Sequence, residues 1–201
     1  MNKRGYCLVA IAFFAVLAVA LPVFAGSATE QIKETSDEIL AIVSDPALKG
    51  SSHDKERRIL IRKAVDKRFD WEEMSRRSLA RHWSKRTGEE KKEFVGLFGQ
   101  LLERTYLDKV EGYSGEKVEY VGESIDGEYG VVDVKIMTTK NEEIDVQYRL
   151  RKKDDSQWMV YDISVTGVSL VNNYRSQFNS ILSKGPYSSL VERLKEKIAQ
   201  D

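Results

Sequence analysis

The residue types that most often carry out chemistry are scarce in this chain. His53 and His82 are the only histidines, and the single cysteine, Cys7, lies near the N-terminus. A zinc site needs several such ligands at suitable spacing, and no cluster of this kind occurs in the sequence. No G-x-S-x-G turn is present to place a nucleophilic serine, and no glycine-rich loop to hold a phosphate. The sequence therefore predicts a protein without a metal site and without enzymatic activity. A hydrolase with an apolar pocket is the weakest of the open alternatives.

The charged residues indicate solubility rather than a charged ligand. Lys and Arg number 32, and Asp and Glu also number 32. Loss of residues 1–25, which contain Lys3 and Arg4, would leave 30 basic against 32 acidic residues, a net charge of −2. Nucleic-acid binding requires a concentrated basic excess. We therefore expect no nucleic-acid partner.

What remains is apolar surface at regular spacing. Between Val168 and Leu182 the apolar residues follow one helix face, with Ser169 as a candidate N-cap and Gly167 as the corner that precedes it. A second apolar row runs from Phe94 to Tyr106. Together with the apolar face of a sheet, these rows predict one interior. The pattern alone does not decide between a filled core and a cavity.

The periodicity of the chain changes from helical to alternating and back. Helices are expected over 29–44, 55–68, 70–83, 87–109, 169–182 and 186–199, and strands over 116–125, 129–138, 142–152 and 157–166. Capping boxes are predicted at Asp70 with Glu73 and at Thr87 with Glu90. Alternation assigns to one face of the sheet the residues Ile144, Val146, Tyr148 and Leu150 of the third strand and Met159, Tyr161, Ile163 and Val165 of the fourth.

These elements predict the α+β class. We expect a helical N-terminal half (29–112), a four-stranded antiparallel meander sheet (116–166) and C-terminal helices (169–200) in one domain, residues 26–201. A curved sheet packed against helices resembles an NTF2-like cone, an analogy at the level of fold alone.

Residues 1–25 have the pattern of a signal peptide. Lys3 and Arg4 precede an apolar run, and Val23-Phe24-Ala25 places small residues where a signal peptidase cleaves. Cleavage is predicted after Ala25, with Ala28 as the alternative site, so that the protein would be exported to the periplasm. An uncleaved membrane anchor is the other interpretation, because the apolar run is long enough to span a bilayer.

Three blocks of the sequence resemble the MlaC, or toluene-tolerance, family of periplasmic phospholipid-binding proteins. They are F-D-W-E-E-M-S-R-R-S-L-A-R-H-W (69–83), F-V-G-L-F-G-Q-L-L-E-R-T-Y-L (94–107) and W-M-V-Y-D-I-S-V-T-G-V-S-L-V-N-N-Y-R-S-Q-F (158–178). The last block is the longest and most specific, and the resemblance extends over nearly the whole chain after residue 25.

The resemblance implies a shuttle rather than an enzyme. Acyl chains of a glycerophospholipid would lie in a hydrophobic cavity as cargo, without a cofactor. The implied partners are an inner-membrane ABC transporter with an MCE-domain ring and an outer-membrane lipoprotein complex, between which the protein would carry lipid as a monomer and maintain outer-membrane asymmetry. A non-enzymatic envelope scaffold with a filled core is the alternative.

The apolar rows supply the candidate residues for such a cavity. Arg104 and Arg175 are the candidate mouth residues. The predicted lipid-binding residues are Phe94, Leu97, Phe98, Leu101, Tyr106, Val132, Val134, Ile144, Val146, Tyr148, Leu150, Met159, Tyr161, Ile163, Val165, Leu170, Val171 and Tyr174.

Overall fold

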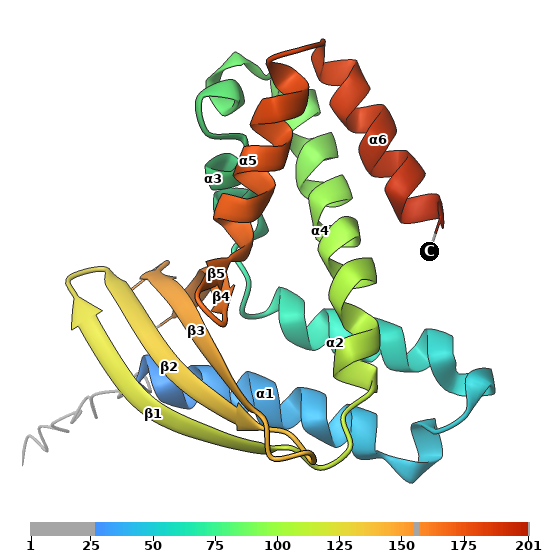
Figure 1. Cartoon of the computed structure of the whole chain (residues 1–201), viewed down its shortest axis with the longest axis vertical. Helices are drawn as coiled ribbons and strands as arrows, with labels where there is room; N and C mark the ends of the chain where they lie inside the picture. Colours follow the sequence, from blue (N-terminus) through green and yellow to red (C-terminus); the bar gives the residue numbers. More distant parts are fainter. Residues whose placement is uncertain (1–26, 155–156, 201) are drawn as a thin grey trace, which may run out of the picture.

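A computed structural model describes residues 27–154 and 157–200. The order is helices, then a sheet, then helices, which confirms the α+β class (Figure 1). The α-helices are α1 (Ala28–Ser44), α2 (Asp54–Asp66), α3 (Trp71–Leu79), α4 (Gly88–Glu111), α5 (Leu170–Leu182) and α6 (Tyr187–Gln200), and the strands are β1 (Lys117–Asp126), β2 (Tyr129–Met137), β3 (Glu143–Lys152), β4 (Trp158–Val165) and β5 (Val168–Ser169). Short 3-10 turns at Pro46–Leu48, Ser51–His53 and Ala80–Lys85 complete the helical parts.

The helices begin where side chains can bind otherwise unpaired N–H groups. At α4, Thr87 and Glu90 form the predicted capping box, in which each side chain bonds the backbone of the other residue. At α5, the Ser169 hydroxyl accepts the N–H of Asn172 at 3.0 Å, as predicted. Within the described residues, no helix has the length and hydropathy needed to cross a bilayer.

The predicted capping box at the start of α3 is only half formed. The Asp70 carboxylate accepts the N–H of Glu73 at 2.9 Å, but the Glu73 carboxylate binds Arg76 and Arg77 instead. The N–H of Asp70 already has a partner, because it donates to the carbonyl of Val160 in β4 at 2.9 Å. The chain before α3 is therefore docked along the sheet edge, and this docking removes the donor that the capping box needed.

The sheet is an antiparallel meander in the order β1-β2-β3-β4-β5. It is curved, and α1 lies across one of its faces (Figure 1). The prediction of four strands was short by one, because Val168 and Ser169 fold back onto Val165 and Ser164 as β5. Thr166 and Gly167 between them both have positive φ, 47° and 78°, as a tight two-residue hairpin turn requires. The comparison with an NTF2-like cone stays a prediction.

A β-bulge in β4 changes which side chains face α1. Arg149 pairs with Asp162, but its neighbour Leu150 pairs with Val160, so Tyr161 is an extra residue. Trp158 and Val160, before the bulge, therefore pack with α1. After the bulge, the odd-numbered residues take over this face.

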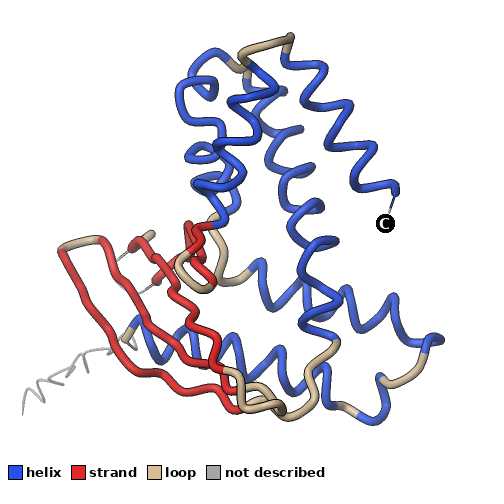
Figure 2. Tube along the Cα trace, in the orientation of Figure 1, coloured by secondary structure: helices blue, strands red, loops and turns tan. Residues whose placement is uncertain are grey.

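Within residues 27–154 and 157–200, the buried apolar residues form two clusters. The helical cluster joins α3, α4, α5 and α6 around the ring contacts of Phe94, Phe98, Tyr174 and Phe178. The sheet cluster joins the start of α1 to β2, β3 and β4. Figure 2 shows the corresponding division, with the helices α3 to α6 on one side and the sheet with α1 on the other.

Residues 1–26 are outside the described part of the chain, so the predicted signal peptide and its cleavage after Ala25 lie there. The structure describes the residues at the alternative cleavage site, after Ala28. Ser27 caps α1 in a capping box with Glu30, and Ala28 is fully buried. Cleavage after Ala28 would remove both residues.

Glu73 should make the free energy of unfolding depend on pH. Its carboxylate is almost fully buried, and hydrogen bonds from Arg76 and Arg77 lower its pKa from 4.5 to about 2. A lowered pKa contributes stability above the unfolded-state value, and this stability is lost as the pH falls from 4.5 to about 2. We predict that Glu73→Gln lowers the free energy of unfolding by about 1–3 kcal/mol at pH 7, and by much less near pH 2.

Denaturant unfolding at a series of pH values would measure this difference. Glu72→Gln is the matched control, because Glu72 is an exposed carboxylate on the same helix turn. A difference between Glu73→Gln and the unaltered protein that stays constant from pH 7 to pH 2 would contradict the assignment.

Candidate functional site

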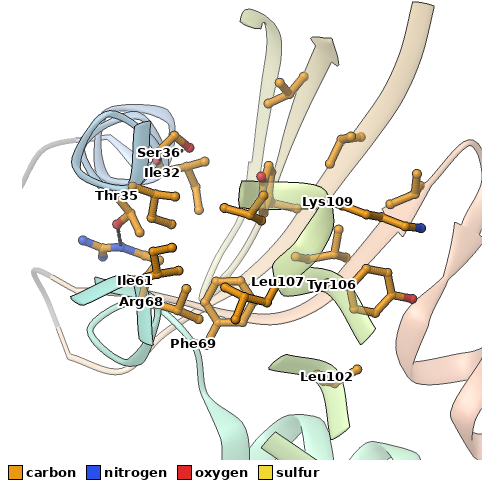
Figure 3. A pocket seen from close by; sticks show the side chains of 18 of the residues that line it. Ile32, Thr35, Ser36, Ile61, Arg68, Phe69, Leu102, Tyr106, Leu107 and Lys109 are labelled. Carbon is orange, nitrogen blue, oxygen red and sulfur yellow. Dashed lines mark hydrogen bonds between the residues drawn. The ribbon is translucent and has the colours of Figure 1, made fainter. Parts of the chain in front are cut away.

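A cavity of about 500 Å³ lies between the two clusters. Its wall comes mainly from α1, α2, the segment from Arg68 to Met74, the C-terminal half of α4 and the face of the sheet that α1 crosses (Figure 3), with Leu170 at the start of α5 beside them. This volume lies within the range of roughly 300–1,000 Å³ that small-molecule sites occupy. Most of the lining side chains are apolar, so the space is suited to an apolar ligand.

The sheet wall follows from the alternation of β2 and β3. Val134 pairs with Val146 and Ile136 with Ile144, so two rows of branched side chains stand next to one another. Tyr148 extends this wall, and burial raises its pKa to about 12. Its hydroxyl is therefore neutral at ordinary pH, and the sheet wall carries no charge there.

Predicted site residues from five elements line the cavity. They are Tyr106 of α4, Val134 of β2, Ile144, Val146 and Tyr148 of β3, Ile163 and Val165 of β4, and Leu170 at the start of α5. Other predicted residues are buried without lining the cavity. Val132 and Leu150 belong to the sheet cluster, whereas Phe94, Leu97, Phe98, Leu101, Val171 and Tyr174 belong to the helical cluster.

The helical residues are away from the cavity because α5 and α6 cover that part of α4. Phe98 packs edge-on against Tyr174 and Phe178 of α5 at ring distances of 5.2 and 5.6 Å. The apolar row of α4 thus serves two purposes along its length. Its first turns form a filled core, and only its last turns, from Leu102 onward, reach the cavity.

Met159 and Tyr161 face away from the cavity. The bulge at Tyr161 reverses the alternation, so these two residues do not share a face with Ile163 and Val165. Tyr161 instead packs against the helical cluster, with the Arg77 guanidinium 4.0 Å from its ring centre. The alternation pattern does not indicate this reversal, because W-M-V-Y at the start of β4 is apolar on both faces.

Neither candidate mouth residue lies at the cavity. The Arg175 Nε donates to the carbonyl of Arg77 at 2.8 Å and so ties α5 to α3. Arg104 of α4 does not line the cavity, although Glu103 and Tyr106 of the same helix do.

The prediction missed the contribution of the first two helices. Ile32, Ile39 and Leu40 of α1 and Ile61 and Val65 of α2 all line the cavity. Their helical spacing was recognisable in the sequence. The sequence did not indicate that α1 would lie across the same sheet face on which the cavity opens.

The two arginines at the wall form hydrogen bonds with other groups of the protein. Arg62 donates to Asp66 at 2.8 Å and to Glu103 at 2.7 Å, which connects α2 to α4. Arg68 donates to Thr35 at 3.2 Å and to the Trp158 carbonyl at 2.8 Å, and it also bonds Gln31.

Figure 3 shows the Arg68 guanidinium turned toward α1 rather than into the cavity. Burial lowers the pKa of Arg68, and the Glu34 carboxylate opposes this shift. In the described part of the chain, no group of three or more His, Cys, Asp or Glu side chains is placed to hold a metal ion.

Comparison with known proteins gives this cavity a family context. Residues 33–196 match the family model described as MlaC protein. The chain belongs to the MlaC family. A curated relative is the intermembrane phospholipid transport system binding protein MlaC of Haemophilus influenzae, 22% identical over 126 residues. The match covers 61% of this chain and 59% of that relative.

A solved structure resembles this MlaC-family chain over most of its length. It is the phospholipid-binding protein of Ralstonia solanacearum in complex with a phospholipid, with a TM-score of 0.78 and 29% sequence identity. The match covers 87% of this chain and 98% of the Ralstonia chain.

The difference between the filled core and the open cavity can be tested with one pair of leucines. Leu101 is fully buried in the helical cluster, whereas Leu40 is half-buried at the cavity wall. We predict that Leu101→Ala lowers the free energy of unfolding by about 3–5 kcal/mol and Leu40→Ala by about 1–2 kcal/mol. Leu40 already faces space on one side, so its truncation removes fewer contacts.

Urea unfolding of protein freed of bound apolar molecules would give both values. Equal losses for the two variants would show that the wall at Leu40 is packed like the core.

Proposed function

We propose that this protein binds a glycerophospholipid and holds its acyl chains in the cavity between the sheet, α1, α2 and the end of α4. The apolar wall of this cavity, about 500 Å³ in volume, is the observation that carries the proposal. The phospholipid complex of the Ralstonia protein supports it, since that chain matches this one nearly end to end.

The energetics suit a carrier rather than a permanent lipid store. Transfer of an acyl chain of roughly sixteen carbons into water raises its free energy by on the order of 12 kcal/mol, at about 0.8 kcal/mol per CH₂. An apolar wall offers comparable burial without fixed polar contacts to the chain. Release to a membrane or a partner then requires no strong bond to be broken.

We further propose that the protein works in the periplasm as a monomeric shuttle between the two membranes. The name of the Haemophilus relative, an intermembrane transport binding protein, supports this role. The proposed partners are an inner-membrane ABC transporter with an MCE-domain ring and an outer-membrane lipoprotein complex, and the proposed result is maintenance of outer-membrane lipid asymmetry. No enzymatic step or cofactor belongs to this function.

Export would use residues 1–25 as a signal peptide cleaved after Ala25. This site leaves Ser27 in place to cap α1 and Ala28 in place beneath it. The cleaved chain would therefore keep the helix that covers the sheet.

The alternative function is a scaffold that binds envelope proteins without a lipid. Such a scaffold would bind its partners equally well with and without lipid in the cavity. The open volume at the wall favours the carrier.

Residues 26–201 should purify from a Gram-negative host with phospholipid bound. Solvent extraction followed by mass spectrometry and phosphorus analysis would detect it. Repeated recovery of folded protein without phospholipid, together with no uptake from labelled vesicles, would contradict the proposed function.

Three valine-to-glutamate variants distinguish an effect on lipid binding from an effect on folding. Val146→Glu places a carboxyl group at the cavity wall, and we predict at least tenfold less retained lipid with the circular dichroism of the folded protein. Val168→Glu makes the same change at an exposed position and should retain lipid. Val171→Glu makes it inside the helical cluster and should unfold the protein. Equal lipid retention by Val146→Glu and Val168→Glu would contradict the location of the site.

A further inference from the structure

Three cationic side chains line the cavity, and Lys109 differs from the other two. The Arg62 guanidinium is held by the carboxylates of Asp66 and Glu103, and that of Arg68 by α1 and β4. Across residues 27–154 and 157–200, the Lys109 ammonium has no hydrogen bond and no ion pair, and its contact is with an aromatic ring. Its charge is therefore available to a ligand.

The carboxylates nearest to Lys109 in the sequence or at the wall have other partners. Glu103 binds Arg62 at 2.7 Å. Glu116 accepts the N–H of Ser114 at 2.8 Å and its hydroxyl at 3.0 Å. Asp108 lies 3.8 Å from the Arg58 guanidinium. No ion pair within the described residues therefore neutralises Lys109.

Lys109 lies beside the hydroxyl of Tyr106, a second donor that has no hydrogen-bond partner in the described part of the chain. The Lys109 Nζ lies 5.4 Å from the centre of the Tyr106 ring, one helix turn away. Figure 3 shows both polar ends on the side of the cavity opposite Arg68. Lys109 is exposed and Tyr106 is half-buried, so the pair lies where the cavity meets solvent. Burial, with a smaller contribution from Tyr174, raises the pKa of Tyr106, so its hydroxyl remains protonated.

We propose that Lys109 and Tyr106 bind the phosphate of the phospholipid headgroup at the mouth of the cavity. This inference rests on the proposed function, because the acyl chains must occupy the cavity for the phosphate to arrive there. An ammonium group and a phenol are both donors, and phosphate oxygens accept charge-assisted hydrogen bonds from such groups. The pair would recognise the phosphodiester that all glycerophospholipids share and would not select among their headgroups.

Lys109 also lies in the last turn of α4, where a cation interacts favourably with the helix dipole. This structural role would stabilise the protein without affecting the choice of lipid. A test of the proposal must therefore compare two lipids with the same acyl chains, of which only one carries a phosphodiester headgroup.

The experiment measures binding of phosphatidylglycerol and of diacylglycerol with the same acyl chains to protein freed of lipid. The preference is the ratio of the two dissociation constants. Lys109→Met should lower the preference for phosphatidylglycerol by about three- to tenfold, since an exposed contact of this kind contributes modestly. Lys109→Arg should restore it to within about twofold, and Tyr106→Phe should lower it by about two- to fivefold.

Lys197→Met is the matched control, because Lys197 is an exposed lysine of α6 away from the cavity. It should leave the preference unchanged. An equal loss of both lipids in Lys109→Met, or an unchanged preference, would overturn the headgroup assignment while phospholipid binding itself stands. No binding of either lipid by the unaltered protein would instead overturn the proposed function.

A free phosphate ion has the same acceptor oxygens as the headgroup and is the other ligand that this pair of donors could bind. Inorganic phosphate should not bind the lipid-free protein measurably at millimolar concentration. Saturable binding that Lys109→Met abolishes would overturn the assignment to a lipid headgroup.

Discussion

The extra residue in β4 is the constraint on which the arrangement of this protein depends. Before Tyr161, the strand places Trp158 and Val160 against α1, and after it the strand places Ile163 and Val165 at the cavity. The bulge also positions Asp162, whose buried carboxylate accepts the Ser169 hydroxyl at 2.6 Å and the N–H of Val171 at 3.0 Å. This one register shift therefore determines which side chains of β4 join the sheet cluster, which line the cavity and which bind the start of α5.

Charged side chains connect the elements that surround the cavity. Arg62 connects α2 to Glu103 of α4, and Gly99 leaves room for this guanidinium, since a Cβ atom at Gly99 would lie 3.1 Å from it. Arg68, which follows α2, donates hydrogen bonds to α1 and to β4. These contacts connect the helices to one another and to the sheet around the apolar side chains that line the cavity. The cost of leaving apolar surface uncovered is offset when an apolar ligand enters.

The absence of catalytic motifs in the sequence and the composition of the cavity wall are consistent with one another. A carrier needs burial for acyl chains and few directional contacts, and the wall has mainly branched aliphatic and aromatic side chains. The guanidinium groups of Arg62 and Arg68 bind other parts of the protein, whereas Lys109 and Tyr106 have no side-chain hydrogen bond within the described residues. The two arginines chosen from the sequence were unsuitable because helical position alone does not show whether a guanidinium meets a ligand or, as for Arg175, a carbonyl of the next helix.

The sequence by itself determined the elements and their class. Periodicity and the Thr87 and Ser169 caps are local signals, and each acts within a few residues of the chain. The clean alternation of β3 likewise placed Ile144, Val146 and Tyr148 correctly on one face. Tertiary structure decided which apolar surfaces are filled and which stay open. Phe98 and Tyr106 belong to the same helical row, yet only the packing of α5 over α4 places one in the core and the other at the cavity. The bulge at Tyr161 and the position of α1 across the sheet depend on contacts between residues far apart in the chain, which no local pattern records.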